Sequence, residues 1–234
     1  MESNRRQFLS GSAVLGIGAL ILPNMAAHAD DKPKDEKKNG EEDVTATEDL
    51  MREHGVLNRV LLIYEEGLRR IHAKEDVAPE MFQKPAMLVR KFVEEYHEKL
   101  EENHIFPEFE KRKKLVDLVK VLRAQHEAGR KVTDVILRNA TGDRFGKEDA
   151  RAELIAACQG FIRMYRPHEA REDTVLFPAL HKIVSSSQLK ELGEKFEKEE
   201  DRLFGEEGFE KTVDQVAALE KQLGIHDLAK FTAK

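Results

Sequence analysis

The chain has 234 residues, of which 36% are charged, and a formal net charge of −6 at pH 7. Phosphate contacts need clustered Lys and Arg with little opposing charge, so this balance argues against a nucleic-acid-binding protein. A single cysteine, Cys158, excludes an intramolecular disulfide framework and a Cys-rich metal site. Few Gly and Pro, no Trp and long Leu-, Glu- and Lys-rich runs predict an all-α protein.

Residues 1–29 have the features of a signal peptide. Arg5 and Arg6 precede an apolar run over residues 13–22, and residues 27–29 supply the small side chains that a signal peptidase reads. The run is too short for a permanent membrane anchor. Paired arginines followed by a polar residue and Phe-Leu resemble the twin-arginine signal. That resemblance implies export of the folded protein by the twin-arginine machinery, to a periplasmic location.

Residues 30–44 are predicted to be a disordered linker, because they are highly charged and too poor in apolar residues to fold alone. After the linker we expect a four-helix bundle over residues 45–183 and a helical extension over residues 184–234. The connections between the predicted bundle helices are short, which favours an up-down-up-down topology.

The predicted helices follow from apolar periodicity, caps and prolines. Thr45 and Glu48 have capping-box spacing and open a first helix that runs to about Ala73. The second runs from about Pro85 and is expected to stop at Phe106-Pro107, because proline cannot donate the helical hydrogen bond. The remaining helices are expected over about 113–139, about 147–178 or slightly beyond, from Ser185 capped with Gln188, and over 212–223.

Two stretches repeat within the predicted bundle: HEKLEENHIFP at residues 97–107 and HEAREDTVLFP at residues 168–178. In each stretch a Glu lies four residues after the first His, as Glu101 and Glu172. Residues at i and i+4 lie one turn apart on one face of a helix. Each helix therefore offers an imidazole and a carboxylate to the same point.

One histidine falls in an apolar-periodic stretch of each bundle helix: His54, His97, His126 and His168. A single such His is more often a core or boundary residue than a ligand, but four of them with two matched Glu favour a shared site. Four imidazoles and two carboxylates suit two adjacent iron or manganese ions with bridging carboxylates and an open position. The other histidines of this part, at 72, 104, 181 and 226, lack such partners, and we expect them at the surface or at helix ends.

Several residues near the predicted ligands have two possible roles. Glu98 and Glu169 each follow a ligand His; they could assist the metals, but neighbours on a helix are rotated by about 100°, which favours solvent. Tyr165 lies one turn before His168, where core packing is the default and a hydrogen bond to a bound oxidant is the alternative. Gly129 leaves space that a small ligand could use.

These motifs together resemble those of the hemerythrin-like, HHE cation-binding domains. The resemblance covers residues 45–183: His54 before Gly-Val-Leu, His126 in Gln-His-Glu, and the two His/Glu pairs before Phe-Pro. It implies a four-helix bundle with a non-haem di-iron centre that binds oxygen, nitric oxide or peroxide. Unlike the oxygen-carrying hemerythrins, this chain has Leu122 and Arg130 one turn either side of His126, so the third helix offers one His. The set is closer to iron-centre repair and iron-sensing members.

The sequence therefore predicts an exported protein with two iron ions, iron being favoured over manganese, that binds or reduces oxygen, peroxide or nitric oxide. The alternatives are iron storage, sensing or donation for iron-centre repair, reversible oxygen binding without turnover, and a metal-free interaction bundle. A ferritin-like oxidase would need Glu-x-x-His on two helices. Glu94 and His97 provide it once, but Tyr165 occupies the matching place before His168.

Overall fold

The computed structural model describes residues 44–233, in which all regular secondary structure is helical. The all-α prediction is confirmed. Of the described residues, 45–233 belong to one compact unit. The predicted signal peptide, and all of the predicted linker except Val44, lie outside the described residues. None of the described helices is both long and apolar enough to cross a membrane.

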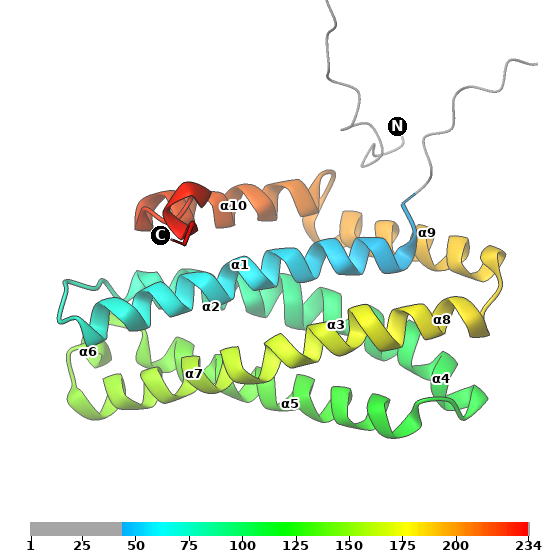
Figure 1. Ribbon diagram of the computed structural model, residues 1–234, viewed down its shortest axis with the longest axis horizontal. Coiled ribbons are helices and arrows are strands. Elements are labelled where there is room, and N and C mark those ends of the chain that lie inside the picture. Colours follow the sequence, from blue (N-terminus) through cyan, green and yellow to red (C-terminus); the bar gives the residue numbers. More distant parts are fainter. Residues whose placement is uncertain (1–43, 234) are drawn as a thin grey trace, which may run out of the picture. The chain divides into compact units, whose positions relative to one another are not determined.

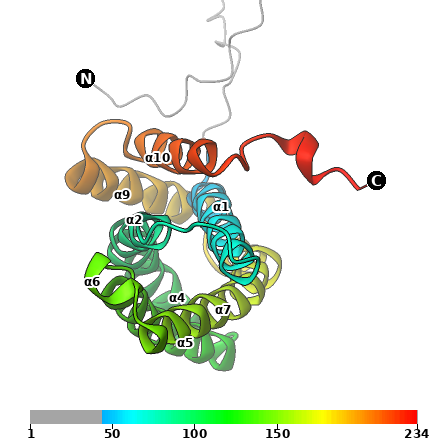
Figure 2. The same ribbon diagram turned by 90° about the vertical axis from the view of Figure 1, so that its left-hand side faces the viewer.

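Four long helices form an antiparallel bundle with up-down-up-down topology (Figure 1). The first is α1 (Ala46–His72) and the third is α5 (Val116–Asn139). The second is a continuous run of α2 (Glu80–Leu88), η1 (Val89–His97), α3 (Glu98–Leu100), η2 (Glu101–Ile105) and α4 (Phe106–Arg112). The fourth is a run of α7 (Glu148–Arg171), η3 (Glu172–Leu176) and α8 (Phe177–Ile183), preceded by the short α6 (Gly142–Phe145). Seen end-on, the four helices surround a common axis (Figure 2).

The predicted stop at Phe106-Pro107 is wrong, because the second helix continues through it to Arg112. A π-helical turn, η2, precedes the proline, and the Phe106 N–H donates to the Glu101 carbonyl five residues back. The fourth helix passes Pro178 in the same way, with the Phe177 N–H donating to the Glu172 carbonyl. Since Pro107 has no N–H, the Glu102 carbonyl is left to accept a hydrogen bond from Arg123 at 3.0 Å. The wider turns thus carry the helices past both prolines.

Helix starts agree with the predicted caps, but the second helix starts at Glu80 rather than near Pro85, so Pro85 lies inside it. Thr45 and Ser185 each form the predicted capping box. The third helix starts at Val116 rather than near Lys113, because Lys113 and Leu115 have φ angles of 53° and 47°, outside the helical region. This left-handed pair is the turn that reverses the chain between α4 and α5.

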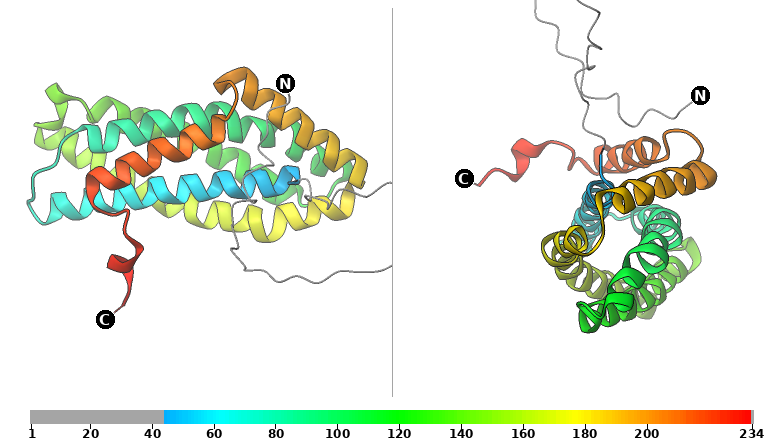
Figure 3. Two further views of the ribbon diagram at one scale, coloured as in Figure 1. Left: turned by 90° about the horizontal axis from the view of Figure 1, so that it is seen from above. Right: turned by 90° about the vertical axis from the view of Figure 1, so that its right-hand side faces the viewer.

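The C-terminal extension packs along one side of the bundle. Helices α9 (Ser186–Phe204) and α10 (Gly208–Leu223) lie over α1 and the second long helix, and a short 3₁₀ turn, η4 (Leu228–Phe231), follows (Figure 3). α10 starts four residues before the predicted Thr212. The Phe204 ring lies 5.4 Å from that of Tyr96, and Glu220 pairs with Arg59 at 2.7 Å. The extension therefore seals the bundle by both apolar and ionic contacts.

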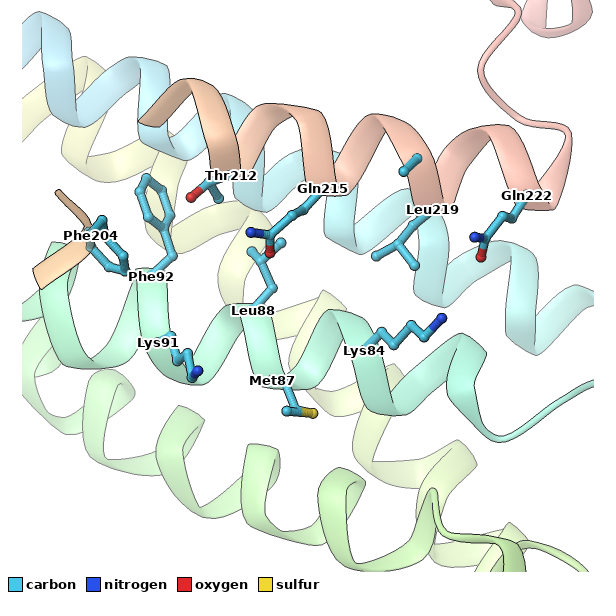
Figure 4. A pocket seen from close by; sticks show the side chains of 11 residues that line it. Lys84, Met87, Leu88, Lys91, Phe92, Phe204, Thr212, Gln215, Leu219 and Gln222 are labelled. Atoms are coloured by element: carbon cyan, nitrogen blue, oxygen red, sulfur yellow. The ribbon is translucent and has the colours of Figure 1, made fainter. Parts of the chain in front are cut away.

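A groove of about 490 Å³ runs between α10 and the start of the second long helix (Figure 4). Its walls include Leu88, Phe92 and Leu219, and Lys84 and Lys91 lie at its edge. None of the predicted metal ligands lines it. The site chemistry lies inside the bundle instead.

Candidate metal centre

The four predicted histidines converge inside the bundle and meet in two pairs. Nε2 of His54 lies 3.1 Å from Nε2 of His97, and Nε2 of His126 lies 3.1 Å from Nε2 of His168. All four are buried, with side chains 0–4% exposed. Their helices are α1, the end of η1, α5 and α7, so every long helix of the bundle supplies one imidazole.

The two predicted carboxylates each reach from one histidine pair to the other. The Glu101 Oε2 atom lies 3.7 Å from Nε2 of His97 and 3.4 Å from Nε2 of His126. The Glu172 Oε2 atom lies 3.4 Å from Nε2 of His54 and 3.2 Å from Nε2 of His168. Both carboxylates are fully buried. This is the arrangement of two bridging groups between two adjacent positions with two imidazoles each.

The π-helical turns position these carboxylates. Glu101 is the first residue of η2 and Glu172 the first residue of η3. Such turns are rare and often occur at functional sites. The five residues of each turn also explain why both repeats have the same spacing from Glu to Phe-Pro. The repeated motif thus encodes a ligand and the helical turn that carries it.

The outer nitrogen of every histidine at the site has an acceptor. The Nδ1 atoms of His54, His97, His126 and His168 face Asp173, Glu53, Glu102 and Gln125 at 2.7, 2.7, 3.1 and 2.9 Å. Because an ionised carboxylate or an amide oxygen can only accept, each Nδ1 carries a proton, and each ring that is neutral presents a lone pair at Nε2. Two lone pairs that face one another at 3.1 Å repel unless a proton or a metal ion lies between them.

Unpartnered oxygens test whether a metal fits this site. All four side-chain oxygens of Glu101 and Glu172 are buried without a hydrogen-bond partner among the described residues. Buried carboxylates left in this way are costly unless they are protonated or bind a cation. Four imidazole lone pairs and two carboxylates are a donor set that suits iron or manganese. The residues present therefore fit a pair of metal ions.

The protonation of the site follows from burial and charge. Burial and the nearby Glu172 raise the pKa of Glu101 well above its usual range. Burial acts to raise the pKa of Glu172 too, but His168 and His54 outweigh it, so the net shift is downward. Burial lowers the pKa of His126 to about 4, which favours the neutral imidazole that a metal needs. Without a cation, the site favours one ionised and one protonated carboxyl; two cations would favour both as carboxylates.

Glu98 and Glu169 do not face solvent, so that expectation is wrong. Both are buried, with 1% and 3% of their surface exposed, and burial raises the pKa of each to about 8. Glu98 accepts a hydrogen bond from Tyr165 at 2.7 Å and pairs with Arg130 at 2.7 Å, whereas Glu169 accepts one from Asn58. A residue rotated by about 100° from the core of a bundle faces the seam with the next helix, and these polar partners make burial there tolerable.

Tyr165 and Gly129 form one contact. The Tyr165 hydroxyl donates to Glu98, and a Cβ atom at Gly129 would lie 2.0 Å from that hydroxyl oxygen. The space at Gly129 is therefore filled by tyrosine, not left for a small ligand. The default role predicted for Tyr165, core packing, is confirmed by its 1% exposure.

The remaining histidines of this part lie away from the two pairs. His72, His181 and His226 are exposed, as predicted, and His181 makes a 2.7 Å hydrogen bond with Thr47. His104 is half-buried beside the Phe196 ring. The single cysteine, Cys158, is fully buried in the core.

The sequence reasoning missed the four Nδ1 acceptors. Each one is the immediate chain neighbour of a predicted ligand: Glu53 precedes His54, Gln125 precedes His126, Glu102 follows Glu101, and Asp173 follows Glu172. Each serves a histidine on another helix. Their position beside the ligands was a usable signal, because the neighbour of a ligand points toward the adjacent helix.

The fold and the paired His/Glu site define a class of cation-binding helical bundle. The family model described as Hemerythrin HHE cation binding domain matches residues 45–180, with a second, overlapping match over residues 117–228. The chain belongs to this hemerythrin family. The second match begins in α5, where the second half of the site also begins.

Similar chains occur in mycobacteria. An uncharacterized protein of Mycobacterium bovis and two from strains of Mycobacterium tuberculosis are each 49% identical over 189 residues, which is 81% of this chain and 74% of theirs. No solved structure matches this chain significantly.

Proposed function

We propose that the protein holds two iron ions on His54, His97, Glu101, His126, His168 and Glu172, and that it binds or reduces a small oxidant: oxygen, peroxide or nitric oxide. One observation carries the proposal: Glu101 and Glu172 each contact one histidine of each pair, at 3.2–3.7 Å. A single-metal site would not need both carboxylates to reach both pairs. Iron is favoured over manganese by the imidazole-rich donor set.

The bound iron pair would supply the electrons for reducing an oxidant. The chain's residues do the rest. Neutral imidazoles hold the two positions, and their Nδ1 partners fix each ring. Two imidazoles on each side and two shared carboxylates would hold the ions, and a donor set of this size would leave room for a small molecule to bind. The Phe177 and Phe106 rings stack on His54 and His126 at 5.7 and 5.5 Å and exclude water from that side.

Metal content tests the proposal directly. Purified protein, or metal-free protein loaded anaerobically with Fe(II), should contain about two iron ions per chain, as four His and two Glu shared by two metals imply. Circular dichroism should show the same helices before and after loading. A folded protein that takes up no Fe(II) would refute the site, and a folded protein that takes up one would refute the pair.

Rapid mixing separates reduction from carriage. Anaerobically reduced protein should consume peroxide or nitric oxide and become oxidised at both irons, with poor release of intact oxygen. The measurement is optical spectroscopy with product analysis after mixing with each molecule separately. A stable oxygen adduct that releases oxygen under vacuum, without turnover of the other two, would leave a carrier or a sensor.

We also propose twin-arginine export to the periplasm, on the basis of Arg5 and Arg6 and the small residues at 27–29. Folding before export would allow iron loading in the cytosol, away from copper and zinc that compete for such a site. Changing both arginines to Lys should leave a folded precursor in the cytoplasm, measured by cell fractionation. Unchanged export of that variant would argue against this route.

A further inference from the structure

The two histidine pairs of the site have different partners on their outer nitrogens. In the first pair, His54 and His97 donate to Asp173 and Glu53, both at 2.7 Å. Both acceptors are carboxylates. Among residues 44–233, no Lys or Arg pairs with Asp173. The first pair therefore has two anionic partners.

The second pair is poorer in negative charge. His168 donates to the neutral amide oxygen of Gln125 at 2.9 Å. His126 faces Glu102 at 3.1 Å, but that carboxylate also pairs with Arg130 and Lys99, each at 2.5 Å. Two cations thus contact the only anionic Nδ1 partner of this pair, and Arg130, with 22% of its side chain accessible, also pairs with Glu98. Counted over the Nδ1 partners alone, the second pair has one carboxylate and the first pair has two.

Such partners change the relative stability of the oxidised and reduced states of a bound metal ion. A carboxylate that accepts from the outer N–H makes an imidazole a stronger electron donor, and buried charge acts strongly because screening is weak. Both effects stabilise a ferric ion over a ferrous ion. The ligands themselves give no preference, because each pair has two imidazoles and shares the same two Glu.

Resting on the proposed di-iron function, we propose that the two metal positions are inequivalent, and that the position held by His54 and His97 is the more easily oxidised. When an external one-electron acceptor removes one electron from the doubly reduced protein, the ferric ion lies at His54 and His97, and the ferrous ion at His126 and His168. Gln125 and Glu53 are the positioning residues that set this order, since they are the matched neutral and charged partners.

The test is a stepwise redox titration of anaerobic protein loaded with iron, read by optical and electron paramagnetic resonance spectra. The wild type should show two separated one-electron steps and a half-oxidised species. Gln125→Glu adds a negative charge at the position that is harder to oxidise. It should reduce the difference between the two reduction potentials, seen as a severalfold fall in the comproportionation constant. Glu53→Gln removes a negative charge at the position held by His54 and His97. It should also reduce the difference between the two reduction potentials.

One control variant and an iron analysis accompany this titration. Glu127→Gln changes a charge on α5 next to His126, but Glu127 is exposed and contacts no ligand, so the separation should stay unchanged. Iron analysis of every variant comes first: fewer than two irons in the wild type would refute the proposed function. With two irons bound, a separation that widens or stays constant in both Gln125→Glu and Glu53→Gln overturns the inequivalence.

Discussion

The site has two halves, one on α1 and η1 and the other on α5 and α7. The predicted ligands have the same arrangement in both halves, but the residues around them differ. The His54 and His97 rings lie 4.8 Å apart at 53°, and the His126 and His168 rings 4.9 Å apart at 54°. Farther out, Glu98 pairs with Arg130 and Tyr165, whereas its counterpart Glu169 accepts from Asn58.

The difference shows which parts of the site are constrained. A metal ligand must present one atom at one point, which restricts its residue type and its position on the helix. An Nδ1 partner needs only an accepting oxygen within reach, and Asp, Glu and Gln all provide it. Charge outside the ligands is therefore free to differ between the halves.

The largest expected effect comes from the shared carboxylates. Glu101→Gln or Glu172→Gln should remove metal from both positions, because each carboxylate contacts both pairs. The loss of affinity should exceed the roughly 10–100-fold typical of residues that only support a ligand. Anaerobic Fe(II) titration measures it, with circular dichroism as the check that the helices persist. Loss of metal from one position alone would contradict the bridging arrangement.

A smaller effect is expected from the close contact between Tyr165 and Gly129. Gly129→Ala should destabilise the protein by about 1–3 kcal/mol, because the new Cβ would overlap the Tyr165 hydroxyl, 2.0 Å away. Gly55→Ala on α1 is the matched control: nothing lies within 4 Å, so the better helix propensity of Ala should stabilise by about 0.5–1 kcal/mol. Denaturant unfolding of metal-free protein measures both. Equal effects at the two sites would show that Tyr165 yields at no cost.

The last expected effect is a pH dependence of the stability of the metal-free protein. Burial raises the pKa of Glu98 and Glu169 from 4.5 to about 8. Between these values the folded state keeps a proton that the unfolded state has lost, so stability should fall as pH rises toward 8 and level off above it. The slope should be at most about 1.4 kcal/mol per pH unit per group. Glu169→Gln should make the free energy of unfolding depend less steeply on pH between 4.5 and 8. An unchanged slope would show that Glu169 does not titrate in this range.

Much of the fold was predictable because local signals agreed with the packing. The capping boxes at Thr45 and Ser185 fix two helix starts from a few neighbouring residues. The convergence of the six predicted ligands also followed from i, i+4 spacing and apolar periodicity, since these place side chains on the inner face of a bundle.

Two of the failures come from features that a regular α-helical pattern does not include: a π-helical turn and buried polar contacts between helices. Pro107 reads as a stop only if the preceding turn is α-helical, and the π-helical turn that carries Glu101 removes that condition. Glu98 was expected to be exposed because a buried carboxyl needs polar partners. Its partners, Tyr165 and Arg130, come from distant parts of the chain. Such pairings depend on tertiary contacts that spacing along one helix does not reveal.

The internal repeat has a consequence for symmetry. One helical hairpin, from α1 to α4, already carries two His, one Glu and one Phe-Pro turn, so two identical hairpins related by a two-fold axis could build a complete site from separate chains. In such a dimer every substitution would appear twice, and the two positions would be identical by construction. Joining both hairpins in one polypeptide removes that restriction, and only then can Gln125 occupy the place that Glu53 holds on the opposite side.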